Sequence, residues 1–323
     1  MKLRLSLLSA LLTVTTLLSV PLAAAAYPDK PVKLLVGYGP GGATDIIARV
    51  LSKYLSDKWG QAVVVENKPG ASGMIAANDV VRANPDGYTL LLGYTPEVSI
   101  NQLVFTNMRY DPIKDLTPIS LAADAPLVLA VGAKLPVKSL KEILDKGKGT
   151  TPLTYGSPGV GGQQHMAGEL LGGATKIPLT HIPYKGTGPA VAALVGGQID
   201  LFFATTPPLL GQIRAGKVTP IAVAGSQREK LLPDVPTFVE LGYPAIQLTN
   251  WFGVFGPRNL PAPVLNKITT DVTAALKDPA VVKQLEDQGL TPRPISGAEF
   301  VKFIASEMSK YAPIIKGANI RAE

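Results

Sequence analysis

The sequence predicts an α/β protein made of two doubly wound lobes that are joined by a hinge. After the N-terminal segment, short apolar runs alternate with helical patterns for about a hundred residues. The alternation restarts near residue 126, and the C-terminal third is mainly helical. Because short buried strands separated by helices form parallel sheets covered on both faces, two such series predict two lobes.

The first 26 residues have the organisation of a secretory signal peptide. Lys2 and Arg4 precede an apolar run from residue 5 to about 20, and four alanines occupy positions 23–26. A membrane helix needs roughly 20 apolar residues, so an uncleaved anchor is the weaker alternative. We expect export and cleavage after Ala26, which would place the mature protein in the periplasm.

Composition excludes several classes of function. The chain has 323 residues, enough for two domains, and a formal net charge of +7 without a run of Lys or Arg. Nucleic-acid binding is therefore not expected. The absence of cysteine excludes disulfides and thiolate metal sites, and no His, Asp and Glu cluster has metal-ligand spacing. We expect neither a metal nor a cofactor.

The first lobe is predicted from five elements in order. Residues 32–37 form an apolar strand-like run, and residues 45–55 place apolar side chains at helical spacing. An apolar β-branched run at 63–65 predicts the second strand. Residues 74–81 read as a helix that ends at an Asn-Pro-Asp-Gly turn, before a third strand at 88–93.

The second lobe repeats this order. Its expected strands are residues 127–131, 154–156, 181–184, 199–204 and 221–224. Its expected helices are residues 139–144, capped by Ser139, a helix from the glycine-rich segment to about 171, and 189–195.

The C-terminal third has too few strands to form another α/β domain. It contains one expected strand at 251–255 and three helices at 263–276, 279–288 and 297–311. We expect it to pack on the first lobe, with hinge crossovers near 121–125 and 245–250. Domain 1 would then comprise residues 27–124 and 247–323, and domain 2 residues 125–246.

A glycine-rich loop at residues 37–45 lies between the first strand and the first helix. Ligands of open parallel sheets bind at the carboxyl ends of the strands, where this loop lies. The unpaired amides and dipole of the following helix favour an anion there. Asp45, near the helix start, is interpreted as its N-cap.

A second glycine-rich loop, within residues 155–165, has the same position in the second lobe. Either loop alone could be only a tight connection. Two loops in matching positions favour a ligand role, and one carboxylate held between them would connect the lobes and favour closure.

The first loop also satisfies the dinucleotide pattern G-x-G-x-x-G at Gly37, Gly39 and Gly42. The rival hypothesis is therefore an exported, nucleotide-dependent oxidoreductase. Against it, a chain exported unfolded does not bring a cytosolic nucleotide. Pro40 removes an amide donor, and Asp45 adds negative charge where pyrophosphate would lie.

Catalytic interpretations are weaker. No G-x-S-x-G motif is present, and Ser157 follows a glycine without a recognisable triad order. His165 and His181 are the two histidines of the chain. Each is better explained as a packing or hydrogen-bonding residue, so no enzymatic activity is expected.

Six segments carry a family resemblance: YPDKPV at 27–32, PGGATD at 40–45, VVENKPGA at 64–71, PDGYTL at 85–90, PYKG at 183–186 and LPDVPT at 232–237. In this order and combination, the chain resembles the Bug/TctC family, the extracytoplasmic solute receptors of tripartite tricarboxylate transporters. The resemblance covers essentially the whole chain after residue 26.

The resemblance implies a type II periplasmic-binding-protein fold that closes on its ligand as a monomer. The ligand would be a small organic carboxylate or an acidic amino acid, delivered to membrane permease subunits of the transporter or to a sensor. The predicted ligand-binding residues are Tyr38, Gly41, Gly42, Thr44, Asp45, Thr95, Ser157, Gly161, Gly162, Gln163, Ala204 and Thr205.

The chain departs from the family pattern where the ligand would be selected. It has Gly-Tyr-Gly-Pro-Gly-Gly at 37–42 in place of Pro-Phe-Pro-Pro-Gly-Gly. Gly162 replaces a frequent Ser or Thr, and Ala204-Thr205 replace Asp-Asn. Glu97 replaces a small residue or His, and could meet a ligand amino group or face solvent. The identity of the ligand therefore stays open.

Overall fold

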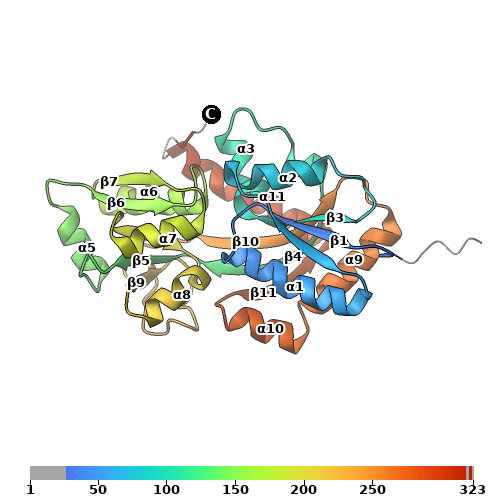
Figure 1. The fold of residues 1–323 in the computed structure, drawn as a ribbon. Helices are drawn as coiled ribbons and strands as arrows, with labels where there is room; N and C mark the ends of the chain where they lie inside the picture. The colour runs from blue at the N-terminus through green and yellow to red at the C-terminus, as the bar shows by residue number, and fades with distance from the viewer. Residues whose placement is uncertain (1–26, 318–319, 322–323) are drawn as a thin grey trace, which may run out of the picture.

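The computed structural model describes residues 27–317, 320 and 321. The predicted signal peptide, residues 1–26, lies outside them. The described chain forms two α/β lobes side by side, each built around one sheet (Figure 1). We call the lobe with the six-stranded sheet lobe 1 and the lobe with the five-stranded sheet lobe 2.

Lobe 1 contains a mixed sheet with the strand order β11-β4-β10-β3-β1-β2. Its strands are β1 (Val32–Val36), β2 (Val63–Asn67), β3 (Thr89–Tyr94), β4 (Leu116–Pro126), β10 (Thr249–Pro257) and β11 (Thr291–Ser296). β1 pairs in parallel with β2 and β3, as the alternation predicted, whereas β10 is antiparallel to both β3 and β4. The parallel pairing expected from the first three strands is therefore confirmed, and β10, which returns from lobe 2, runs against its neighbours.

Helices cover both faces of this sheet. They are α1 (Ala43–Trp59), α2 (Met74–Val81), α9 (Ala262–Ala275), α10 (Pro279–Glu286) and α11 (Gly297–Gly317). Leu34 of β1 packs with α1, α9 and α10, whereas its neighbour Leu35 packs with α2 and α11. Successive side chains of a strand point to opposite faces, so both must be apolar in a sheet covered on both sides.

Short helical segments complete lobe 1. They are a 3₁₀ turn (Ala71–Gly73), a π turn (Pro96–Ile100), α3 (Asn101–Val104) and α4 (Pro112–Asp115). These turns follow the ends of β2 and β3, and the π turn carries Glu97 into the interior of the lobe.

Lobe 2 has the strand order β7-β6-β8-β5-β9. Its strands are β5 (Val128–Gly132), β6 (Leu153–Ser157), β7 (Leu179–Pro183), β8 (Leu201–Ala204) and β9 (Val218–Val223). Its helices are α5 (Leu140–Gly147), α6 (Gln163–Thr175), α7 (Thr187–Gly196) and α8 (Thr206–Arg214). The predicted cap of α5 is confirmed, because the Ser139 hydroxyl accepts the Glu142 amide at 3.3 Å.

Two neighbouring strands carry the chain between the lobes (Figure 1). Only Leu127 separates β4 from β5, and its amide donates to the Leu248 carbonyl just before β10, at 3.1 Å. The predicted crossovers near 121–125 and 245–250 overlap these strands. The domain boundaries at 124/125 and 246/247 stay a prediction.

α11 adds a third link between the lobes. Phe300 and Ile304 belong to the core of lobe 1, whereas Tyr311 and Ile315 pack with strand residues of lobe 2. The helix is longer than the predicted 297–311, and it contacts α6 of lobe 2, where Gln163 donates to the Tyr311 hydroxyl. Across the described ranges, no helix is both long and apolar enough to traverse a bilayer.

The packing of β5 against α7 gives a stability prediction. A Cβ atom on Gly132 would lie 2.1 Å from the Leu194 carbonyl oxygen, a backbone atom that cannot rotate away. We expect Gly132→Ala to lower the free energy of unfolding by about 1–3 kcal/mol, measured by urea denaturation. Gly211→Ala in α8, with no atom within 4 Å of its Cβ, should instead leave stability equal or raise it by up to about 1 kcal/mol. Equal stabilities of Gly132→Ala and the unchanged protein would contradict this account.

Candidate functional site

The two glycine-rich loops have the same backbone conformation. Gly41 and Gly161 have φ of 84° and 80°, a left-handed region that favours glycine. Gly42 (φ −83°, ψ 169°) and Gly162 (φ −72°, ψ 169°) follow as the N-caps of α1 and α6. Each loop therefore ends in a helix whose first amides have no partner within the helix.

A side chain on the first turn of each helix reaches back to fix its loop. The Asp45 carboxylate accepts the Gly41 amide at 3.0 Å, and His165 Nδ1 accepts the Gly161 amide at 3.1 Å. The interpretation of Asp45 as an N-cap was wrong, because Gly42 holds that position and Asp45 lies three residues later. These bonds occupy the amides of Gly41 and Gly161.

Asp45 is buried and held ionised by three donors. Besides Gly41, Arg49 Nε donates to it at 2.9 Å and Asn67 Nδ2 at 3.0 Å. Burial acts to raise its pKa, but these hydrogen bonds outweigh burial and leave the pKa of Asp45 lowered. Its negative charge is therefore matched locally by Arg49.

The second loop is held by neutral groups. The rings of His165 and His181 stack with centroids 3.9 Å apart, and His181 Nε2 lies 2.6 Å from Ser157 Oγ. Burial lowers the pKa of His181 to about 3, so the ring is neutral near pH 7. The Ser157 hydroxyl also donates to the Gly159 carbonyl at 2.6 Å, which makes it part of the loop's own hydrogen bonding.

A small cavity of about 30 Å³ lies between the two loops. Five of the predicted residues line it, namely Tyr38, Gly42, Thr44, Ala204 and Thr205. The N-terminal residues of α1, α6, α7 and α8 all contribute to its wall, so four positive helix ends converge there. Tyr, Thr, Gln and Asn supply its polar side chains, and no charged residue lines it in the described structure.

The other predicted residues lie around the cavity without lining it. Gly41, Gly161, Asp45 and Ser157 shape the loops as described above, and Gly162 caps α6. For all of these, contact with a ligand stays a prediction.

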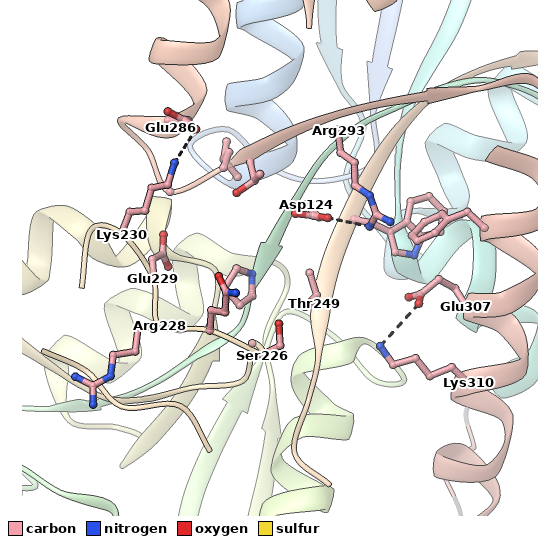
Figure 2. A pocket seen from close by; sticks show the side chains of 18 residues that line it. Asp124, Ser226, Arg228, Glu229, Lys230, Thr249, Glu286, Arg293, Glu307 and Lys310 are labelled. Carbon is pink, nitrogen blue, oxygen red and sulfur yellow. Dashed lines mark hydrogen bonds and ion pairs between the residues drawn. The ribbon is translucent and has the colours of Figure 1, made fainter. Parts of the chain in front are cut away.

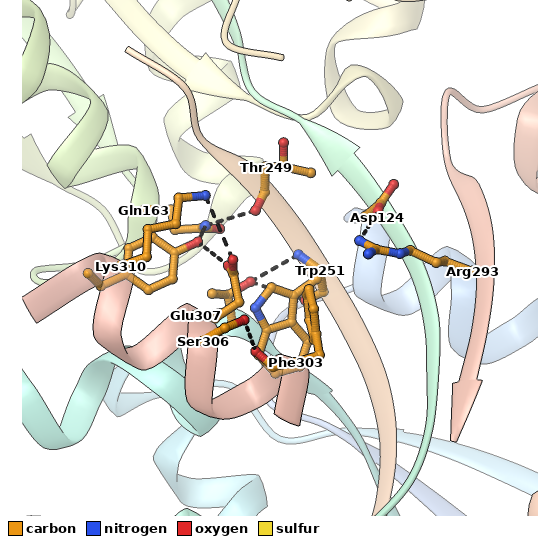
Figure 3. Close-up of polar contacts among 11 residues, drawn as sticks. Asp124, Gln163, Thr249, Trp251, Arg293, Phe303, Ser306, Glu307 and Lys310 are labelled. Carbon is orange, nitrogen blue, oxygen red and sulfur yellow. Dashed lines mark hydrogen bonds and ion pairs between the residues drawn. The ribbon is translucent and has the colours of Figure 1, made fainter. Parts of the chain in front are cut away.

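Two further predicted residues point away into the protein. Thr95 is buried and exchanges hydrogen bonds with the backbone of Trp251, at 3.0 and 3.2 Å. Gln163 Nε2 donates to the Thr249 carbonyl at 3.0 Å and to the Tyr311 hydroxyl (Figure 3). Gln163 therefore connects α6 by hydrogen bonds to α11 and to β10, which we call the hinge strand because it carries the chain between the lobes.

The sequence reasoning missed several lining residues, including Pro158, Gln164, Thr187, Asn250 and Phe252. For Asn250 a signal existed, since it is a polar residue directly before the apolar Trp-Phe-Gly-Val-Phe run at the expected crossover. Tyr94 and Gln164 adjoin the predicted Thr95 and Gln163. No sequence signal distinguished which of two neighbours would face the cavity.

Glu97 does not face solvent, which was one of the two roles left open for it. Its side chain is fully buried behind Tyr38, and its carboxylate accepts the Tyr38 hydroxyl at 3.0 Å and the Tyr94 amide at 2.8 Å. The solvent-facing alternative is wrong, and Glu97 does not line the cavity. Burial raises the pKa of Glu97 to about 8, despite the hydrogen bonds that favour its charged form.

The lobes contact each other across the cavity, so the structure is closed. Ser72 Oγ donates to the Val160 carbonyl at 3.1 Å, and Gln164 Nε2 donates to the Tyr94 hydroxyl at 3.0 Å. A groove of about 760 Å³ shares Tyr38 with the cavity and continues from it. Lys185 and Arg321 line this groove, and no acidic side chain does so among the described residues.

The hinge strand β10 separates the cavity from a second pocket. Asn250 and Phe252 line the cavity, whereas Thr249 and Trp251 line a pocket of about 550 Å³ on the other face of the strand (Figure 2). That pocket is rich in ion pairs, including Arg293 with Asp124 at 3.1 Å and, between the lobes, Lys230 with Glu286 at 3.0 Å. The charged side chains of this pocket are thus paired within the protein except Glu229, which accepts a hydrogen bond from the Thr206 hydroxyl.

Comparison with known proteins agrees with this architecture. The family model described as the tripartite tricarboxylate transporter family receptor matches residues 47–320. Protein BugT of Bordetella pertussis is 34% identical over 308 residues, which cover 94% of each chain.

Solved structures match over nearly the whole chain. An R. palustris protein determined with adipate has a TM-score of 0.89 at 32% identity, covering 91% of this chain and 99% of that one. MatC from Rhodopseudomonas palustris, determined with bound malate, has a TM-score of 0.84 at 33% identity, covering 90% and 100%. The chain belongs to the tripartite tricarboxylate transporter receptor family, a family of periplasmic solute-binding receptors.

Proposed function

We propose that this receptor captures a small carboxylate in the cavity between its two glycine-rich loops and delivers it to the membrane subunits of a tripartite tricarboxylate transporter. The observation that carries the proposal is the convergence of four helix N-termini on one cavity without charged side chains. Such ends bind anions through backbone amides and the helix dipole. The similar receptors determined with adipate and with malate support the same ligand class.

The available amides suffice for a useful affinity. A hydrogen bond to a charged group contributes roughly 1.5–3 kcal/mol. A micromolar ligand requires about 8 kcal/mol after the costs of association. Three or four amide bonds to one carboxylate, together with the Thr44 and Thr205 hydroxyls at the cavity wall, are of the right magnitude.

Binding would favour closure because the cavity wall is shared between the lobes. Gly42 and Thr44 belong to lobe 1, whereas Gln164 and Thr205 belong to lobe 2. A ligand that contacts both sets is held fully only in the closed state, so its differential affinity shifts the population toward that state. Lys185 and Arg321 in the adjoining groove would raise the local concentration of anions.

Further features belong to this proposal. Residues 1–26 would act as a signal peptide cleaved after Ala26, which places a monomeric receptor in the periplasm. Gly42, Thr44, Tyr38, Ala204 and Thr205 would contact the ligand, and Gly41, Asp45, Ser157, Gly161 and Gly162 would shape the loops. Thr95 and Gln163 would hold the hinge strand beside the cavity. Delivery to a sensor in place of a permease is the alternative destination.

An exported nucleotide-dependent oxidoreductase is the weaker hypothesis. Pro40 has no amide proton, and the Gly41 amide already donates to Asp45, so the G-x-G-x-x-G loop offers few donors to a pyrophosphate. We infer that the protein carries out no chemical step on its ligand.

The first prediction concerns Gly42, which lines the cavity in an extended conformation that other residues adopt. No atom lies within 4 Å of a Cβ built there. Gly42→Val should therefore fold normally but place two methyl groups in the cavity. We expect a loss of affinity of at least a hundredfold, measured by isothermal titration calorimetry with a panel of mono-, di- and tricarboxylates.

Gly42→Ala should give a smaller loss, and Gly211→Ala in α8 should bind like the unchanged protein. Thermal melting would verify that the variants are folded. Unchanged affinity in a folded Gly42→Val variant would remove the first loop from the site. Failure of the unchanged protein to bind any small carboxylate would contradict the proposed function.

The second prediction concerns Glu97, which orients Tyr38 at the cavity. Its pKa is about 8 when folded, against an ordinary value of 4.5. The folded state therefore binds the proton more tightly, so the stability that Glu97 contributes is present below about pH 4.5 and is lost as the pH rises through 8. Relative to Glu97→Gln, the unchanged protein should lose up to about 1.4 kcal/mol of unfolding free energy per pH unit in this window.

Urea denaturation at pH 5, 6, 7 and 8 measures this difference, and Glu299→Gln on the exposed face of α11 is the control. The raised pKa of Glu229 is common to all three proteins and cancels in the comparison. Parallel pH profiles for the unchanged protein and Glu97→Gln would show that Glu97 is not a buried protonated group.

A further inference from the structure

Asn250 is a buried polar side chain at the wall of the cavity. It lies on β10, where it pairs in register with Ala125 of β4, and only 1% of its surface is exposed. Within the described chain, its side-chain oxygen has no hydrogen-bond partner. Buried polar atoms in native proteins are nearly always satisfied, so an unpaired acceptor at a binding cavity calls for a partner from outside the protein.

The wall of the cavity around Asn250 includes the first residues of four helices, α1, α6, α7 and α8. Amides at helix N-termini are donors to which an ionised carboxylate is the matching acceptor, although Pro207 and Pro208 in the first turn of α8 have no N–H. A carboxylate cannot satisfy the Asn250 oxygen, because it is itself only an acceptor. A ligand that satisfies the whole cavity must therefore also carry a hydrogen-bond donor.

The charges near the cavity favour a neutral donor over an ammonium group. The nearest buried carboxylates are directed elsewhere: Asp45 to Arg49 and the Gly41 amide, and Glu97 to Tyr38 and Tyr94. An ammonium group would enter a desolvated site where no carboxylate lines the wall. A hydroxyl group donates one hydrogen bond and brings no charge that must be matched.

The position of Asn250 is fixed by its strand. Phe252, two residues along the same face of β10, stacks on Tyr94 with ring centroids 5.2 Å apart. Thr249, on the opposite face, holds Gln163 through its carbonyl group. A side chain placed by a paired strand can distinguish ligands that differ in a single atom, because it cannot move to compensate.

We propose that the Asn250 side-chain oxygen accepts a hydrogen bond from a hydroxyl group of the ligand, so that this receptor selects hydroxy-substituted carboxylates over the corresponding unsubstituted acids. This inference rests on the proposed function, since it assigns a substituent to a carboxylate held by the two loops. Asn250 would be a specificity-determining residue of that site.

The test compares matched ligand pairs that differ in one hydroxyl group. Malate and succinate, 2-hydroxyglutarate and glutarate, and lactate and propionate cover three sizes, and calorimetry gives a dissociation constant for each. We expect the unchanged protein to bind the hydroxy acid of the best-fitting pair at least tenfold more tightly than its partner. Aspartate, which has an ammonium group in place of the malate hydroxyl, should bind more weakly than malate.

Substitution of Asn250 should remove the preference without removing binding. Asn250→Leu keeps nearly the same shape, and we expect it to bind the two acids of the pair within about twofold of each other. Asn250→Ala is the second variant in case leucine packs poorly. Thr249→Val, on the face of β10 turned away from the cavity, should retain the preference, and thermal melting would verify that each variant is folded.

The outcomes separate the two hypotheses. Equal affinities for both members of every pair in the unchanged protein would overturn the role of Asn250 while leaving carboxylate binding intact. An equal loss for both acids in Asn250→Leu would also overturn it, because the side chain would then donate to a carboxylate instead of accepting from a hydroxyl. Tighter binding of aspartate than of malate would exclude the hydroxyl assignment. If no acid of the panel bound, the proposed function itself would fail.

Discussion

The site depends on backbone amides that cannot be satisfied within their own helices. The first amides of an α-helix have no intrahelical acceptor, and burying them without a partner is costly. Here the first residues of α1 and α6, which belong to different lobes, line one cavity together with the first residues of α7 and α8. An anion that accepts from both lobes relieves this cost only when they are together. Recognition and closure are therefore one physical event in this fold.

Most of the fold could be predicted because its strands are short, apolar and separated by helical patterns. The α/β class and the two lobes are confirmed, and α2 begins and ends where the periodicity placed it. β4 begins at Leu116, before the predicted crossover, and β11 was missed because Pro292 and Pro294 disguise it. α3 and α4 are four residues each, too short for a periodic signal. β10 is antiparallel to its neighbours because the chain returns from lobe 2 to lobe 1 at this strand. The local sequence pattern does not encode the direction of that return.

The candidate site was predictable to the level of the loop but not of the side chain. A step of one residue along a helix turns the side chain by about 100°, so Gln164 lines the cavity while Gln163 ties α6 to the hinge. A step of one residue along a strand reverses the face, so Asn250 and Thr249 line different pockets. The glycines marked where the backbone turns. Core packing across the whole lobe decides the rotation of the helix or strand that follows each loop. That rotation determines which of its side chains line the cavity.

Each glycine-rich loop is held by a side chain from the helix that follows it, Asp45 in lobe 1 and His165 in lobe 2. The two side chains differ in charge, and this difference matters for a site that binds an anion. Asp45 fixes its loop with a negative charge, which Arg49 and Asn67 must stabilise so that it does not oppose the ligand. His165 fixes the second loop with a lone pair, and this works only while the ring is uncharged, because a protonated imidazole has no acceptor for the Gly161 amide. Burial lowers the pKa of His165, although nearby Glu169 acts to raise it. The neutral His165 ring therefore holds the loop of lobe 2 without adding a second charge beside the cavity. Because no charged side chain lines the cavity in the described structure, the hydrogen-bond donors and acceptors of the cavity wall must discriminate among anions.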